Sequence, residues 1–118
     1  MKPHIKIGKV GESLATEYLI NKGYKILLTN YKNAIGEIDI IASINNIIVF
    51  VEVKTSSSLN FGRPKERINY YKIGKIKNVA TLYLKQKGLL NKVLVRFDCI
   101  EIIGDLQDYE IEHIENIF

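Results

Sequence analysis

Two adjacent asparagines, Asn45 and Asn46, constrain the fold more than any other feature of this sequence. They separate two runs rich in isoleucine and valine, residues 37–43 and 47–55, and this composition is typical of β-strands. Asparagine is the non-glycine residue that best tolerates the positive φ angles of a tight two-residue hairpin turn. The sequence therefore predicts an antiparallel hairpin in which residues equidistant from the turn face each other.

This register gathers charged side chains on one side of the predicted sheet. Asp39 is expected to face Glu52 and Glu37 to face Lys54, because side chains along a strand alternate between the two faces. The opposite side carries the aliphatic residues Ile38, Ile40, Val49, Val51 and Val53. The polar patch is thus local to one face of one hairpin.

Two facing carboxylates, Asp39 and Glu52, predict a cation between them, because their β-carbons lie about 5 Å apart and like charges repel at that distance. Such oxygen ligands suit Mg²⁺, which takes one or two carboxylates and fills its shell with water and phosphate oxygens. Lys54 lies two residues beyond Glu52 on the same face, where it could act on a metal-bound water. A solvated face with a Glu37–Lys54 ion pair is the alternative, but it leaves Asp39 opposite Glu52 unexplained.

Hydrophobic spacing and turn residues divide the remaining chain into alternating elements. The predicted order is a helix over residues 8–22, strands over 24–30, 37–43 and 47–55, a helix over 64–87, a strand over 93–103 and a short strand or turn over 111–118. This αβββαβ order predicts one α/β domain over residues 1–118, with a mixed central sheet flanked by helices.

Each predicted helix has a buried stripe. In the first, Glu12 shares its stripe with Ala15 and Leu19, so its carboxylate should point toward the sheet and needs a partner there. The second buries six residues at helical spacing, namely Ile68, Tyr71, Ile76, Val79, Ala80 and Tyr83.

Composition excludes several classes of protein. With 118 residues, 47% of them hydrophobic and 25% charged, the chain is an ordinary folded domain. Its longest aliphatic or aromatic run, residues 47–51, is too short to cross a membrane, and its charged N-terminus is unlike a signal peptide. The single cysteine, Cys99, fits a small core residue, and we expect a cytoplasmic protein without a disulfide.

Charge is segregated along the chain. Residues 63–87 contain eight Lys or Arg and one Glu, whereas residues 98–118 contain seven acidic residues and no Lys or Arg. The basic segment predicts a polyanionic partner such as nucleic acid, and a lysine-rich solvated helix face is the open alternative. Its first basic residues, Arg63, Lys65 and Arg67, are candidates for nucleic-acid binding.

Several weaker patterns are given structural interpretations. Arg96 and Asp98 alternate with apolar neighbours on a predicted strand and should form a structural ion pair. His4 and His113 lack clustered Cys or His partners, so each is expected at the surface and not as a zinc ligand.

Four segments carry motifs that occur together in one family, namely Gly8-x-x-Gly11-Glu12, Gly36-Glu37-Ile38-Asp39-Ile40-Ile41, Phe50-Val51-Glu52-Val53-Lys54-Thr55 and Arg96-Phe97-Asp98. They resemble the YraN-like family of bacterial proteins, and the likeness continues to residues 111–118. That family is similar to archaeal Holliday-junction resolvases and other restriction-endonuclease-like nucleases, whose signature is an Asp on one strand and (Asp or Glu)-x-Lys on the next.

The resemblance implies a restriction-endonuclease-like fold and roles for individual residues. Asp39, Glu52 and the backbone carbonyl of Val53 would bind Mg²⁺ or Mn²⁺, Lys54 would act on the attacking water, and Glu12 would support the metal shell through water. Lys72 and Lys75 match basic positions of the family and would contact phosphates. Ser56 replaces the Arg that often follows the Lys-Thr pair, so one phosphate contact is in doubt.

The sequence therefore predicts a metal-dependent endonuclease acting on DNA, including branched or structured DNA, with a homodimer expected because resolvase-type cleavage needs two active sites. The alternative function is a catalytically inactive nucleic-acid-binding accessory protein in recombination or repair. Neither reading requires an organic cofactor or a membrane.

Overall fold

The computed structural model describes residues 10–56 and 70–118, which form two helices and one sheet. In chain order the elements are α1 (Gly11–Asn21), β1 (Lys25–Lys32), β2 (Glu37–Ile44), β3 (Ile47–Ser56), α3 (Tyr70–Gln86), β4 (Leu94–Asp105) and β5 (Asp108–Ile114). Within the described residues each predicted element is present, and the weak last element is a strand, β5; the predicted starts of the two helices, residues 8 and 64, lie outside those residues. No helix in these described ranges has the length and apolar character needed to cross a membrane.

The five strands form one mixed sheet in the order β1-β2-β3-β4-β5. Neighbours are antiparallel except β3 and β4, which run parallel and are separated in sequence by α3. A parallel pair needs such a crossover, whereas antiparallel neighbours can be joined by short turns. The fold is thus the predicted mixed α/β sheet flanked by helices, consistent with a restriction-endonuclease-like core.

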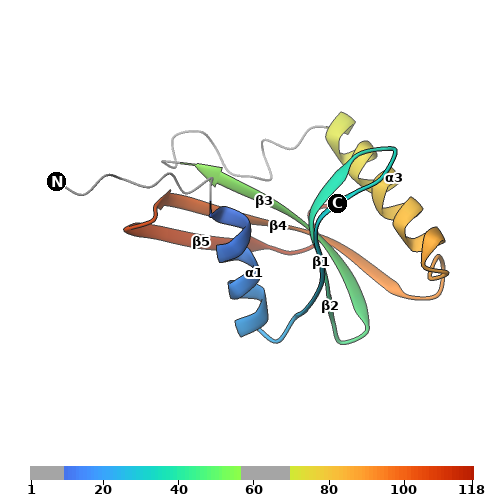
Figure 1. Cartoon of the computed structure of the whole chain (residues 1–118), viewed down its shortest axis with the longest axis horizontal. Helices are drawn as coiled ribbons and strands as arrows, with labels where there is room; N and C mark the ends of the chain where they lie inside the picture. The colour runs from blue at the N-terminus through green and yellow to red at the C-terminus, as the bar shows by residue number, and fades with distance from the viewer. Residues whose placement is uncertain (1–9, 57–69) are drawn as a thin grey trace.

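The two helices cover opposite faces of the sheet (Figure 1). Helix α1 buries Gly11, Ala15 and Leu19, and a β-carbon at Gly11 would lie only 2.6 Å from Cγ2 of Thr55. Glycine at this position therefore lets the start of α1 approach β3 closely. Helix α3 buries Ile76, Val79, Ala80, Tyr83 and Leu84. The other two predicted stripe residues, Ile68 and the side chain of Tyr71, lie outside the described part of the chain.

The hairpin turn is confirmed. Asn45 and Asn46 have φ angles of 48° and 67°, and the β2–β3 ladder runs from the pair Ile44–Ile47 to the pair Ile40–Val51 in the predicted register. At that last pair the ladder ends, and the two strands separate, with β3 continuing beside β4 and β2 beside β1 (Figure 1).

This separation corrects the predicted pairing beyond the ladder. The expected backbone pairs of Asp39 with Glu52 and of Glu37 with Lys54 are absent from the β2–β3 ladder. Glu37 instead pairs with Lys32 on β1, with 3.7 Å between Nζ and Oε2. The physical cause is sheet twist, which rotates neighbouring strands against each other and here carries β2 away from β3.

The face predicted for Ile38 is also wrong. Ile38 was expected beside Ile40 on the α1 face, but it packs in the α3-side cluster with Ile41 and Phe50. Where β2 has left β3 it is paired only with β1, and Ile38 lies opposite Tyr31, which packs against the same cluster.

Candidate functional site

A cleft of about 640 Å³ lies where β2 and β3 separate. It is bounded by the loop between β1 and β2, the start of β2, the middle of β3 and the N-terminal half of α3. Its lining residues are Lys32, Asn33, Gly36, Glu37, Asp39, Glu52, Lys72, Lys75 and Ile76. Three acidic and three lysine side chains therefore meet in one hollow, although the backbone ladder does not pair Asp39 with Glu52.

Asp39 is held in this cleft by a backbone contact across the gap. Its Oδ2 accepts a hydrogen bond from the backbone N–H of Val53 at 2.7 Å. The side chain thus satisfies a donor on β3 that β2 no longer reaches with its own backbone. Burial raises the pKa of Asp39 to about 6, opposed by the Val53 hydrogen bond and assisted by the charges of Glu52 and Glu12.

Glu52 is bound by two lysines from different elements. Lys54 Nζ lies 3.2 Å from Oε1 of Glu52, and Lys72 Nζ, from α3, lies 2.6 Å from the same oxygen. Although burial lowers the pKa of Lys72, its hydrogen bond to Glu52 and the charges of Glu52 and Asp39 raise that pKa above its ordinary value. Lys72 is therefore held as a cation against the acidic part of the cleft.

Glu12 faces a neighbouring hollow. This hollow is lined by Glu12, Ser13, Thr16, Glu17, Ile20, Thr29 and Asn30. With its side-chain nitrogen turned toward Glu12, Asn30 donates to both carboxylate oxygens at 2.9 Å. Burial and the charge of Glu37 raise the pKa of Glu12, and Glu12 in turn raises the pKa of Asp39. Glu12 therefore interacts electrostatically with the cleft from outside its lining.

The donor set of the cleft fits a hard divalent cation. Asp39 and Glu52 supply carboxylate oxygens, and a bound cation would oppose the rise in the pKa of Asp39 that burial and the charges of Glu52 and Glu12 cause. Among residues 10–56 and 70–118, no three His, Cys, Asp or Glu side chains are grouped to hold a metal. Two carboxylates nevertheless match Mg²⁺, which keeps several waters. The carbonyl of Val53 as a further ligand stays a prediction.

The predicted nucleic-acid contacts are only partly within the described chain. Lys72 and Lys75 line the cleft, whereas Arg63, Lys65 and Arg67 lie outside the described residues. Sequence reasoning missed Lys32, which lines the same cleft from β1. Its position immediately before the loop that leads to Glu37 and Asp39 was the available signal.

Sequence reasoning also missed a buried acid on the strand next to Glu52 and Lys54. Glu101 on β4 is buried, lies in register with Lys54 of β3 and accepts a hydrogen bond from Oγ of Ser56 at 3.0 Å. A single charged residue inside the otherwise apolar run of residues 99–103 was the sequence signal for it.

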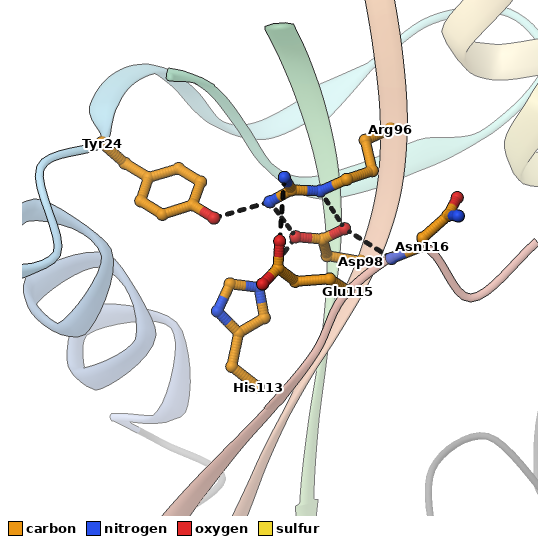
Figure 2. A network of polar contacts seen from close by, with 6 residues as sticks. All are labelled: Tyr24, Arg96, Asp98, His113, Glu115 and Asn116. Carbon is orange, nitrogen blue, oxygen red and sulfur yellow. Dashed lines mark hydrogen bonds and ion pairs between the residues drawn. The ribbon is translucent and has the colours of Figure 1, made fainter. Parts of the chain in front are cut away.

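A separate polar network surrounds Asp98 on β4 (Figure 2). Arg96 donates to both of its carboxylate oxygens at 2.9 and 2.8 Å, the backbone N–H of Asn116 donates to Oδ1 at 3.0 Å, and His113 Nε2 lies 2.8 Å from Oδ2. The predicted Arg96–Asp98 ion pair is confirmed. The surface position predicted for His113 is wrong, because its side chain is only 9% exposed.

Comparison with known proteins gives one consistent result. Residues 11–102 match the family described as "Uncharacterised protein family UPF0102". A UPF0102 protein of Alkaliphilus oremlandii is 50% identical over 118 residues, covering 96% of this chain and 97% of the relative. One of Thermodesulfovibrio yellowstonii is 48% identical over 114 residues, covering 97% and 96%. These names state a family and no activity.

Proposed function

The chain belongs to the UPF0102 family, the YraN-like family that its motifs resemble, and we propose that it is a metal-dependent nuclease that hydrolyses phosphodiester bonds in DNA, including branched or structured DNA. One observation carries the proposal. The carboxylates of Asp39 and Glu52 share a cleft with Lys32, Lys72 and Lys75. The acids suit a divalent cation, and the lysines suit the phosphates of a polyanion.

The proposed division of labour follows the contacts of each side chain. Asp39 and Glu52 would hold Mg²⁺ or Mn²⁺, with Glu12 acting through water. When bound, the ion would polarise a phosphate oxygen and make water a better nucleophile. The N–H of Val53 fixes the orientation of Asp39, and Lys54, which contacts Glu52, would orient the attacking water or offset charge on the phosphate.

The lysines of the cleft would position the DNA backbone. Lys72 lies against Glu52, so binding of a divalent cation would release its ammonium toward a phosphate. Lys32 and Lys75 line the same hollow from β1 and α3. Contacts of this kind give affinity without sequence preference. A homodimer, which would place two such sites on opposite strands, stays a prediction.

A cleavage assay tests the proposal. The purified chain should nick at least one substrate in a panel of junction, flap, single-stranded and duplex DNA with Mg²⁺ or Mn²⁺. Asp39→Asn and Glu52→Gln should each abolish the reaction. Glu37→Gln is the matched control, because Glu37 lines the same cleft but pairs with Lys32. Absence of cleavage on every substrate, or cleavage that survives both substitutions, would contradict the proposal.

A second candidate is a nucleic-acid-binding module without catalysis. The contact between Lys72 Nζ and Glu52 at 2.6 Å favours it, because this ammonium balances the carboxylate without a metal. Titration with Mn²⁺ separates the two candidates. An inactive module with an intact site would bind the ion and the DNA but leave the DNA uncut.

A further inference from the structure

The loop between β1 and β2, residues 33–36, carries an exposed aliphatic side chain at the edge of the charged cleft. Asn33 and Gly36 line the cleft, and Ile35 between them is 41% exposed. Single exposed apolar residues are common on protein surfaces. Ile35 differs from them because several hydrogen bonds hold its loop and because Asn33 and Gly36 of the same loop line the charged cleft.

One side chain, Asn33, closes the loop and ties it to α3. Its Oδ1 accepts hydrogen bonds from the backbone N–H of Ile35 at 2.9 Å and of Gly36 at 3.3 Å. Its Nδ2 donates to the carbonyl of Val79 in α3 at 3.1 Å and to the hydroxyl of Tyr31 at 3.2 Å. Its own N–H donates to the carbonyl of Gly36 at 2.9 Å. The loop is therefore anchored at both ends and against the helix.

Close packing against α3 adds to this anchoring. A β-carbon at Gly36 would lie 3.0 Å from Cε of Lys75 and 3.2 Å from Cγ2 of Val79. The aliphatic part of Lys75 thus lies against the loop, so the loop that carries Ile35 packs directly beside a cationic side chain of the cleft.

We propose, building on the proposed function, that Ile35 is a wedge that inserts between bases at a weakly stacked step of duplex DNA while the lysines of the cleft hold the adjacent phosphates. Proteins that bend DNA insert aliphatic side chains between base steps in this way. The cost of unstacking is lowest where the duplex is already nicked, mismatched or damaged. The preferred ligand is therefore an interrupted duplex, with its phosphates near Lys32, Lys72 and Lys75 of the cleft.

The test compares Ile35→Ala with Leu28→Ala in the full chain. Leu28 is 39% exposed on β1 and does not line the cleft. Binding is measured without divalent ions, so that cleavage does not enter, to a duplex with 2-aminopurine beside a nick and to the same duplex without the nick. The wild type and Leu28→Ala should prefer the nicked duplex and increase its 2-aminopurine fluorescence.

Ile35→Ala should lose about tenfold in affinity for the nicked duplex, together with the fluorescence increase, and keep its affinity for the intact duplex. Ile35→Met, which keeps an apolar side chain of similar size, should retain both the affinity for the nicked duplex and the fluorescence increase. Because Ile35 is exposed, circular dichroism and the melting temperature should be unchanged.

Three results would overturn the wedge. Ile35→Ala could retain the preference, could lose affinity equally for both duplexes, or could alter only the oligomeric state in gel filtration, which would make Ile35 a contact between copies. The nuclease proposal is judged separately. If the fluorescence increase depends on Ile35 but neither Mg²⁺ nor Mn²⁺ supports cleavage, the wedge proposal is supported and the nuclease proposal is contradicted. If cleavage occurs but the fluorescence increase does not, the nuclease proposal is supported and the wedge proposal is contradicted.

Discussion

Asp98 and Asp39 are two enclosed carboxylates of one sheet, and their surroundings are opposite. Around Asp98, burial is outweighed by hydrogen bonds from His113, Arg96 and the backbone of Asn116, and its pKa is lowered. Around Asp39, burial is joined by the repulsion of Glu52 and Glu12, and its pKa is raised to about 6. The first carboxylate is saturated with donors and holds the structure together. The second accepts the N–H of Val53 and has two acidic neighbours, so a bound cation would stabilise its ionised form.

The largest effect is expected at Asp98, where Asp98→Ala would leave Arg96 and His113 without their shared anion. Removing one partner of a buried ionic network costs about 3–5 kcal/mol of unfolding free energy. Urea denaturation measures this change in the free energy of unfolding. A loss below about 1 kcal/mol would show that the network is not the structural element described here.

Asp39→Asn should instead raise the free energy of unfolding. The change keeps an oxygen that can accept the Val53 N–H but removes a charge that burial and two neighbouring acids disfavour. We expect stabilisation by about 1–2 kcal/mol at pH 7, reduced from the full shift because the side chain is partly exposed to solvent. Glu37→Gln, which removes an exposed charge, should change stability little in the same denaturation series. Destabilisation by Asp39→Asn would show that the ionised carboxylate of Asp39 stabilises the fold, as that of Asp98 does.

The two carboxylates should also respond to pH in opposite directions. The pKa of Asp39 rises from 3.8 to about 6 on folding, so its carboxyl favours the folded state when protonated and disfavours it once ionised. The advantage of Asp39→Asn over the wild type should therefore be full above about pH 6 and vanish below about pH 4. Asp98 acts in the opposite direction, since its lowered pKa stabilises the fold above the pKa of the unfolded chain. Denaturation of each variant at several pH values measures both trends.

A smaller effect is expected from Lys72→Met. The ammonium of Lys72 competes with a divalent cation for Oε1 of Glu52. Without DNA, its removal should increase Mn²⁺ affinity by about threefold to tenfold in calorimetry, as expected for one partly exposed charge. Affinity for DNA should fall at the same time. Lys32→Met is the control for the metal, since Lys32 pairs with Glu37, and an equal gain in both variants would argue against a specific competition.

The smallest effect concerns Lys32 and DNA. If Lys32 contacts one phosphate, Lys32→Met should lower the slope of log affinity against log salt by about 0.9. Binding measured over a range of salt concentrations gives this slope. An unchanged slope would remove Lys32 from the proposed contacts.

The sequence predicted those features that depend on local pattern. Helical spacing determines the buried stripe of α3 from Ile76 to Tyr83. Neighbouring residues determine the Asn45–Asn46 turn and the strands around it. The register near the turn was correct for the same reason.

The remaining features depend on contacts between distant segments. The separation of β2 from β3 follows from the twist and pairing of the whole sheet, so the side of Ile38 and the partner of Glu37 could not be read from alternation alone. His113 is enclosed because Asp98 collects donors from β4, β5 and the residues after it. Glu12 was expected to find its partner in the metal or its waters, a role that stays a prediction, and Asn30 is its neighbour only through the packing of α1 beside β1.

The proposed function requires that Asp39 and Glu52 together hold a divalent cation. Crystals soaked in Mn²⁺ and measured at a wavelength with strong manganese anomalous scattering would locate such an ion. We expect an anomalous peak between these two carboxylates, with Lys72 moved away from Glu52, and loss of the peak in Asp39→Asn. Carboxylates that remain apart with no peak between them, and Lys72 still bound to Glu52, would contradict it.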